Sequence, residues 1–191
     1  KLKVLLLLIS DQKTWYVTPS YKELLMLMSS TANKRKPISI PSNTVEKTSN
    51  KLSLMVQYVS KFPETPNRHH FRKWVKAALV QSAEIVIRIV DQEEGLSLNQ
   101  RFRGKAYPTN VLTFTYDDTS PLTGDIVLCA PVVIREAQEQ HKSIDAHYAH
   151  LTIHGVLHLQ GYDHETDLEA ADMEQLESQL MTQLGYPDPY C

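Results

Sequence analysis

Hydrophobic and polar residues alternate from Leu52 onward in a pattern that predicts a half-buried β-strand, because successive side chains of a strand point to opposite faces. Leu52, Leu54, Val56 and Tyr58 are separated by mostly polar neighbours. Three later runs of β-branched and apolar residues, bounded by turn formers, predict three more strands. They cover residues 84–90, 111–116 and 125–129.

Apolar residues at helical spacing predict four helices in the same part of the chain. The first contains Phe71 and Trp74 and begins near Asn67, and the later ones cover residues 131–140, 145–160 and 167–184. We expect Asp145 to cap the helix over 145–160 and Thr166 to open the last helix through a capping box with Glu169. The order is β-α-β, two more strands and three helices, which predicts an α+β fold with a small mixed sheet of about four strands packed with helices.

The first 50 residues differ in composition from the rest. Residues 29–50 are rich in Ser, Thr, Asn, Lys and Pro, a composition that buries too little apolar surface to offset the entropy of ordering. A short helix is expected only at 21–28. We therefore interpret residues 1–50 as a weakly structured extension or linker and residues 51–191 as the functional domain.

Composition places the chain among soluble globular proteins. Apolar residues make up 42% and charged residues 22% of its 191 residues, and no apolar run approaches the roughly 18 residues of a membrane span. The apolar run at 4–9 is too short for a secretory signal. Two cysteines provide no disulfide framework, so we expect a reducing cytoplasm.

Charge is distributed unevenly although the net charge is only −2. Basic residues outnumber acidic ones over 68–105, whereas every charged residue from Asp163 to Cys191 is acidic. This asymmetry fits a polyanion that approaches one face, and it fits equally well two differently charged solvated faces.

Three histidines form the pattern H-x-x-x-H-x-x-G-x-x-H. His154 and His158 lie four residues apart within a predicted helix, which puts both imidazoles on one face. Gly161 stands where a helix would end, and the chain can then turn back to bring His164 to the same point. Three imidazoles suit Zn²⁺ and leave a fourth position open for water, as in catalytic zinc sites. The sequence therefore predicts a zinc site on this helix and its following turn.

The same spacing occurs in metzincin proteases, with one change. Those enzymes carry a glutamate, the general base, directly after the first histidine, and Gly155 stands at that position here. The missing base counts against peptide hydrolysis.

Polar residues near the three histidines allow two interpretations. His147 and His150 lie on the same predicted helix, and we interpret them as ordinary polar positions, with orientation of the metal ligands as the alternative. Asp163 and Glu165 flank His164 and could orient it, accept a proton or cap the next helix. The sequence does not decide between these roles.

A second group of functional residues lies between Ser97 and Phe114. Arg101, Arg103 and Lys105 surround Gly104, in what we expect to be a loop that ends at Pro108. An arginine in a loop near a metal could bind a phosphodiester with two parallel hydrogen bonds. The alternative is an exposed basic turn.

Both segments resemble motifs of the YbeY family of endoribonucleases, the ribosomal RNA maturation factors. HGVLHLQGYDH resembles the family signature, and SLNQRFRGKAYPTNVLTF resembles the second motif. LTGDIVLC and the terminal LGYPDPY also resemble segments of the family's sequences, so that the resemblance covers roughly residues 52–191. Three positions depart from the usual family residues without touching a proposed ligand: Phe102, Ala106 and Thr113.

The resemblance implies a zinc-dependent, single-strand-specific endoribonuclease that acts in ribosomal RNA processing and ribosome quality control. It implies one Zn²⁺ per chain held by His154, His158 and His164, and it places the family's functionally important arginine on Arg103. The implied partners are single-stranded and ribosomal RNA, together with ribosomal particles or ribosome-associated proteins, and no membrane.

Two other functions remain open at this point. A metalloprotease-like hydrolase is supported by the histidine spacing and opposed by Gly155. A ribosome-assembly binding protein with a structural zinc would be favoured by a fourth protein ligand.

Overall fold

The computed structural model describes residues 50–59, 62–117 and 120–191. The first of the chain's two units, residues 1–35, lies wholly outside the described residues, and the second covers residues 36–191. The elements of the described part are, in chain order, β1 (Leu52–Tyr58), α2 (Arg68–Ala78), β2 (Ala83–Val90), α3 (Gln92–Arg103), β3 (Val111–Asp117), β4 (Leu122–Cys129), α4 (Ala130–Glu139), α5 (Ile144–Leu159) and α6 (Asp167–Leu184).

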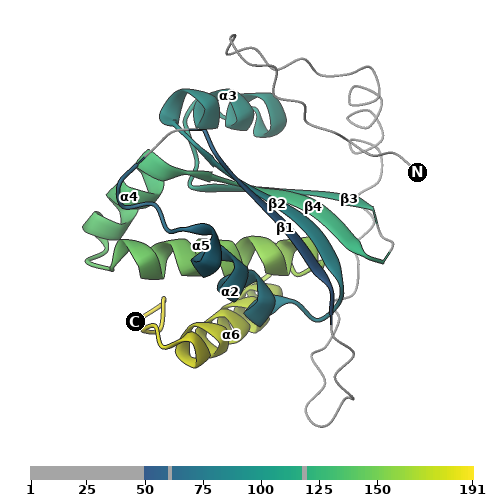
Figure 1. The fold of residues 1–191 in the computed structure, drawn as a ribbon. Coiled ribbons are helices and arrows are strands. Elements are labelled where there is room, and N and C mark those ends of the chain that lie inside the picture. Colours follow the sequence, from purple (N-terminus) through teal and green to yellow (C-terminus); the bar gives the residue numbers. More distant parts are fainter. Residues whose placement is uncertain (1–49, 60–61, 118–119) are drawn as a thin grey trace. The chain divides into compact units, whose positions relative to one another are not determined.

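The four strands form one mixed sheet in the order β1-β2-β4-β3 (Figure 1). β1 pairs in parallel with β2, and β2 pairs in parallel with β4, whereas β3 runs antiparallel to β4. β1 and β3 are therefore the two edge strands. This sheet, together with the helices packed on it, confirms the predicted α+β class and strand number.

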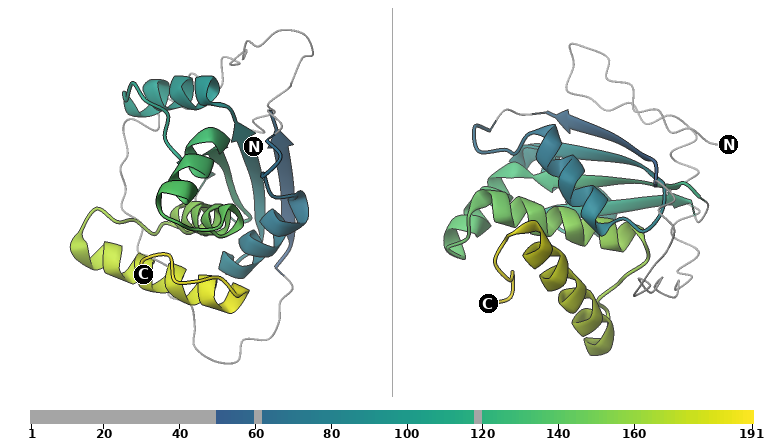
Figure 2. Two further views of the ribbon diagram at one scale, coloured as in Figure 1. Left: turned by 90° about the vertical axis from the view of Figure 1, so that its left-hand side faces the viewer. Right: turned by 60° about the horizontal axis from the view of Figure 1, so that its bottom comes forward.

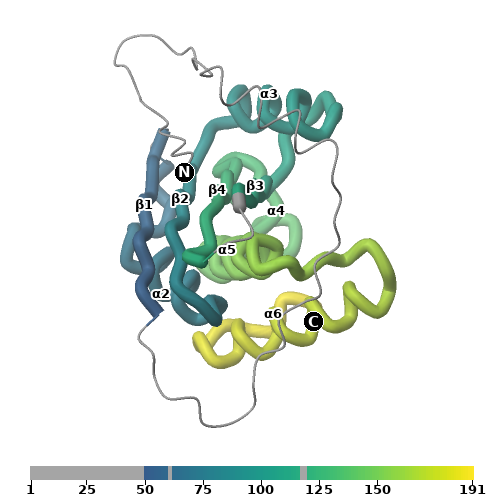
Figure 3. Tube along the Cα trace, turned by 90° about the vertical axis from the view of Figure 1, so that its right-hand side faces the viewer, coloured from purple at the N-terminus to yellow at the C-terminus, as the bar shows by residue number. Residues whose placement is uncertain are grey.

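Alternating side chains of β4 separate the two faces of the sheet. Ile126 and Leu128 belong to the larger core, which α2 and α5 complete, whereas Val127 and Cys129 belong to a smaller core with Leu98 of α3. The sheet consequently lies between α5 and α3, as the view of Figure 3 shows. α6 packs on α5 and α2, away from the strands (Figure 2).

Aromatic side chains fix α5 in the larger core. Phe71 of α2 packs edge-to-face on Trp74 and on Tyr148 of α5, and all three are fully buried. Trp74 also donates a hydrogen bond from Nε1 to the hydroxyl of Tyr186, over 3.2 Å. The helix that carries two of the three histidines is thus held rigidly between the sheet and its neighbouring helices.

α3 is a helix that the sequence analysis did not predict. Asp91 caps its first turn by accepting a hydrogen bond from the backbone N–H of Glu94, over 2.9 Å. Gly104 ends it in the left-handed conformation, with φ of 68°. Arg103, expected in a loop, is therefore the last residue of this helix, and the true loop covers only residues 104–110.

The cap of α5 also differs from the expected one. Ser143 opens the helix, because its Oγ accepts a hydrogen bond from the N–H of Ala146 over 3.2 Å. Asp145 instead lies in the first turn, where it accepts a hydrogen bond from the Tyr186 hydroxyl. A carboxylate in the first turn still interacts favourably with the helix dipole.

The other predicted elements are confirmed with small shifts of their ends. Asn67 caps α2, and Thr166 forms the expected capping box with Glu169 at the start of α6. The short helix expected at 21–28 and all but the last residue of the expected N-terminal extension 1–50 lie outside the described residues. Within the described ranges, no helix has the length and apolar character needed to cross a membrane.

Candidate metal centre

α5 places His154 and His158 one turn apart on a single face. The helix has 16 residues, and at about 100° per residue the face that carries the two imidazoles adjoins the face that packs on the sheet. Gly155 and Leu159 take the sheet side: a Cβ on Gly155 would lie 3.0 Å from Ile126, and Leu159 contacts the position of Gly124. The packing of α5 on β4 thus fixes the direction of the histidine face.

A Schellman motif turns the chain back after α5. Gly161 adopts φ of 90°, and the N–H of Tyr162 donates to the carbonyl of Leu157 over 3.1 Å. Gln160 fixes this turn to α2: its side chain donates to the carbonyl of Ala78 over 2.8 Å and accepts from the N–H of Val80 over 3.0 Å. The turn brings His164 beside the two helical histidines.

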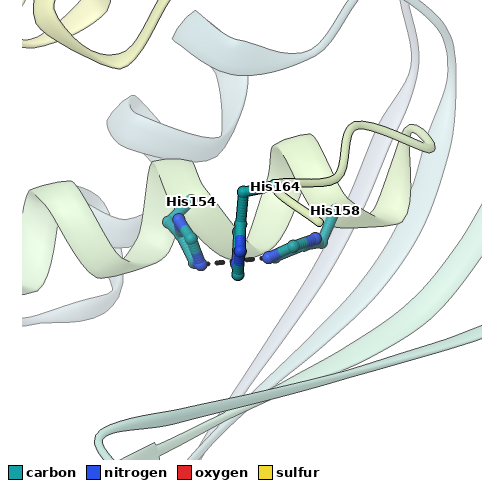
Figure 4. Close-up of side chains that lie close together, drawn as sticks. All are labelled: His154, His158 and His164. Atoms are coloured by element: carbon teal, nitrogen blue, oxygen red, sulfur yellow. Dashed lines mark hydrogen bonds between the residues drawn. The ribbon is translucent and has the colours of Figure 1, made fainter. Parts of the chain in front are cut away.

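The three imidazoles converge on one point (Figure 4). Each offers one nitrogen, and these atoms all lie within 4.8 Å of one another. Nε2 of His154 and Nε2 of His158 are 3.0 Å apart. Two nitrogens on a tetrahedral zinc with bonds of about 2.0–2.1 Å are separated by roughly 3.3 Å, so a small adjustment would accommodate the ion. The donor set and its spacing therefore fit zinc.

His158 is held in the form that binds a metal. Its Nδ1 lies 3.0 Å from the carbonyl oxygen of Tyr162, which can only accept a hydrogen bond, so Nδ1 carries the proton and Nε2 is the free ligand atom. Burial lowers the pKa of His158 to about 4, with further lowering by the neighbouring charges of His154 and His164. At neutral pH this imidazole is uncharged.

Glu177 of α6 contacts His154 from the opposite side. Its side chain is fully buried, and its Oε1 lies 2.8 Å from Nδ1 of His154. Oε2 lies 2.8 Å from Nε2 of His150 and accepts a hydrogen bond from the hydroxyl of Tyr190. Burial alone would raise the pKa of Glu177, but the hydrogen bonds from the two histidines and their charges lower it to about 2. The carboxylate is therefore ionised at neutral pH.

Sequence reasoning missed this carboxylate, and it underestimated His150. Glu177 is one of many acids in the last helix, and nothing in its local pattern distinguishes it from a solvated one. His150 shares Glu177 with a proposed ligand, and His147 is 3% exposed and bonded to Glu136 over 2.9 Å. Neither is an ordinary polar helix position. The regular His spacing along α5 was the available signal.

Arg103 lies apart from the three histidines. It ends α3, which covers the other face of the sheet, and its side chain is exposed. The neighbouring Phe102 packs edge-on against Phe114 of β3, with ring centroids 4.9 Å apart. β3 is the edge strand and also contacts α5. Phe102, the residue before Arg103, and the histidine helix α5 therefore both contact β3, from the two faces of the sheet.

Two asparagines fix the loop between Arg103 and β3. Asn99 is buried, and its Nδ2 donates to the carbonyl of Tyr107 over 2.6 Å. Asn110 donates from Nδ2 to Glu136 over 3.0 Å, and the same carboxylate oxygen bonds to His147 of α5. These bonds give the second sequence motif a physical role: they join the loop to the histidine helix.

The basic stretch 68–105 does not form one surface. Arg88 is 6% exposed and makes an ion pair with Glu94 over 2.7 Å. Arg68 and Arg72 donate to carbonyl oxygens of β1, at the sheet edge remote from β3. The end of α3 and the following loop carry the remaining arginines and Lys105, all exposed beside β3.

Comparison with known proteins assigns the chain to a family. The family profile described as Endoribonuclease YbeY matches residues 39–185, beginning before the first strand. A protein of that name from Nitrosomonas europaea is 60% identical over 156 residues, which cover 82% of this chain and 92% of the relative. Its namesake from Methylobacillus flagellatus is 56% identical over 140 residues, or 73% of this chain and 94% of the relative. A solution structure from Thermotoga maritima matches 68% of this chain and 91% of that protein, with 26% identity and a TM-score of 0.45. The chain is a member of the YbeY family.

Proposed function

We propose that this protein is a zinc-dependent, single-strand-specific endoribonuclease that acts in ribosomal RNA processing and ribosome quality control in the cytoplasm. Membership of a family whose relatives are named endoribonucleases supports RNA cleavage. The observation that carries the metal dependence is the convergence of His154, His158 and His164, with Nδ1 of the first two engaged by acceptors. One Zn²⁺ per chain would be held there.

Each histidine would contribute one nitrogen to the metal, which leaves a fourth coordination position for a water or a substrate oxygen. When bound, zinc supplies Lewis acidity, which makes a water acidic enough to attack near neutral pH and polarises a phosphoryl oxygen. Among the described residues, no fourth His, Cys, Asp or Glu joins the three-histidine group. An open fourth position is typical of catalytic zinc, so the alternative of a purely structural zinc receives no support.

Arg103 would bind phosphate from across the β3 edge. Its guanidinium makes no hydrogen bond or ion pair with another described residue, so its planar fork is available for a phosphodiester. Single-stranded RNA bends readily around the β3 edge of the sheet, whereas duplex RNA is stiff and wide. The placement of Arg103 and the histidines on two sides of β3 therefore favours a single-stranded substrate.

Gly155 argues against the protease alternative on structural grounds. The position that carries the general base in metzincins faces Ile126 of β4 here, where a Cβ atom would lie 3.0 Å from the isoleucine side chain. A glutamate at 155 would enter the sheet interface. Because position 155 provides no general base, peptide hydrolysis would need a base from another residue.

The proposal is tested by incubating purified protein with single-stranded RNA, double-stranded RNA and casein, each with and without a chelator. We expect cleavage of the single strand only, its loss on chelation and its recovery when zinc is added back. Cleavage of casein, or RNA cleavage that survives complete removal of zinc, would refute the proposed function. Precursor ribosomal RNA with single-stranded ends is the natural second substrate.

A further inference from the structure

Glu177 is a charged side chain in a place where charge is costly. It is fully buried between α6 and α5, and burial of an unpaired carboxylate is strongly unfavourable. Three donors compensate this one: His154 at Oε1, and His150 and Tyr190 at Oε2. Each oxygen of the carboxylate thus has at least one donor, and these hydrogen bonds fix the geometry of the Glu177 side chain.

The carboxylate dictates the protonation pattern of His154. An ionised carboxylate only accepts hydrogen bonds, so Nδ1 of His154 carries a proton, and in the neutral imidazole Nε2 then presents its lone pair. Nε2 is the atom that faces His158 at 3.0 Å. The backbone carbonyl of Tyr162 imposes the same pattern on His158. The two helical ligands are thus oriented by different acceptors: the carboxylate of Glu177 in α6 orients His154, and the carbonyl of Tyr162 in the Schellman motif orients His158.

The C-terminal tail completes the arrangement. Asp188 accepts hydrogen bonds from Ser178 of α6 over 2.8 Å and from the N–H of Tyr190 over 3.0 Å, while Lys142 donates to the carbonyl of Pro189. These contacts hold the tail against α6 and near the start of α5, and the Tyr190 hydroxyl donates to Oε2 of Glu177. The tail therefore contacts Glu177 and His150, which lie next to His154 but are not proposed ligands.

We propose that Glu177 is a positioning residue of the metal centre, which fixes the tautomer and ring orientation of His154, and that Tyr190 from the C-terminal tail keeps Glu177 in place. The inference rests on the proposed function in one respect: it takes the three histidines to hold the metal. It assigns to the last helix and the tail a role in metal affinity that is separate from RNA binding. Residues that orient metal-bound histidines typically contribute 10–100-fold to affinity.

Glu177→Gln separates this role from simple packing. The amide has nearly the same size, so the core stays filled, but its NH₂ group faces one of the two histidine nitrogens that Glu177 now accepts from. One imidazole must then change its tautomer or lose its hydrogen bond. Tyr190→Phe is milder because it leaves both histidine contacts in place. Glu174→Gln makes the same chemical change on an exposed position of α6 and serves as the control.

The test is the zinc dissociation constant, measured by competition with a chromophoric chelator for the wild type and the three variants. We expect zinc to bind about 10–100-fold more weakly to Glu177→Gln, less than about tenfold more weakly to Tyr190→Phe, and unchanged to Glu174→Gln. With cobalt in place of zinc, the visible absorption of Glu177→Gln should shift, because the ligand field changes when His154 reorients. A folded Glu177→Gln variant with wild-type affinity and spectrum would refute the role of Glu177.

A second measurement needs no variant. In the zinc-loaded wild type, long-range ¹H–¹⁵N spectra should show His154 protonated at Nδ1, with that proton protected from solvent, and bound through Nε2. Metal bound through Nδ1 of His154 would overturn the inference even if Glu177→Gln failed to fold. A wild type that binds no zinc would instead refute the proposed function, so the two failures are distinguishable.

Discussion

Gly155 lies against Ile126, so closely that a methyl group on the glycine would come within 3.0 Å of two of its carbon atoms. This contact joins the histidine helix to the central strand β4, and it sets the rotation of α5 about its own axis. The residue that distinguishes the sequence from the metzincin proteases is thus a packing residue. Because Gly155 has no side chain, α5 can lie close to Ile126, and this close contact sets the direction in which the histidines point.

Gly155→Ala should reduce stability, against the trend of helix propensity. Alanine gains about 1 kcal/mol in a helix interior, but overpacking of a tight core typically costs about 1–3 kcal/mol. We expect a net loss of up to about 2 kcal/mol in chemical unfolding. Ile126→Val removes one of the crowding methyl groups, so the loss should be smaller in that background. An alanine variant more stable than the wild type would contradict the contact.

Arg103→Ala should keep its fold and zinc but lose RNA cleavage. Removal of one preorganised donor to a developing charge typically costs about 10²–10³ in rate. Arg103→Lys should recover little, since a point charge does not reproduce two parallel hydrogen bonds. The measurement is single-turnover cleavage at saturating protein, which hides weakened binding.

Lys105→Ala provides the control for Arg103. If Lys105 only attracts RNA electrostatically, its loss should weaken binding modestly and lower the salt dependence. Its single-turnover rate should stay that of the wild type. If the Arg103→Ala variant cleaves at the wild-type rate under the same conditions, Arg103 contributes only to RNA binding.

Asn99→Asp should loosen the loop that follows Arg103. The substituted carboxylate has no proton to donate to the Tyr107 carbonyl, now 2.6 Å from Nδ2, and would face it with like charge. Loss of a buried hydrogen bond with an unsatisfied group costs about 1–3 kcal/mol. Hydrogen exchange should accelerate over residues 104–110 while zinc content stays constant. Unchanged exchange there would show that Asn99 does not hold the loop.

The zinc-free protein should lose stability as the pH falls from about 6.5 to about 4. Burial lowers the pKa of His158 to about 4, whereas the unfolded imidazole takes up its proton near the ordinary value of 6.5. The unfolded chain therefore binds more protons in this window, and stability rises with pH across it. The contribution is on the order of 3 kcal/mol. Chemical unfolding at several pH values should show a steeper dependence for the wild type than for His158→Gln, and equal slopes would contradict the shift.

The sequence predicted the sheet and most helices because their signals are local. β-branched runs predicted the strands, and the Thr166 and Glu169 pair predicted the start of α6. α3 was not predicted because Gly95 interrupts its interior and its apolar residues are few, so its helical periodicity is weak. Its formation depends on the caps Asp91 and Gly104 and on packing of Gly95 against Cys129.

The candidate site was predictable only as far as its spacing along one helix. His154 and His158 are neighbours by helical geometry, and the glycine at 161 indicated the turn that returns His164. Glu177 reaches the site through tertiary packing of α6 on α5, 23 residues after His154. No local pattern encodes that contact. For the same reason the packing of α3, which Arg103 ends, on the sheet face opposite α5 could not be predicted from the sequence.

The most direct test of the metal centre is a zinc titration of RNA cleavage. Protein stripped of metal is titrated with zinc, and the rate of single-strand cleavage is measured at each ratio of zinc to protein. We expect no cleavage without zinc, a rise in proportion to added zinc and a plateau at one zinc per chain, with His164→Ala inactive throughout. Full-rate cleavage by the stripped protein, or by His164→Ala, would contradict the assignment of the three histidines.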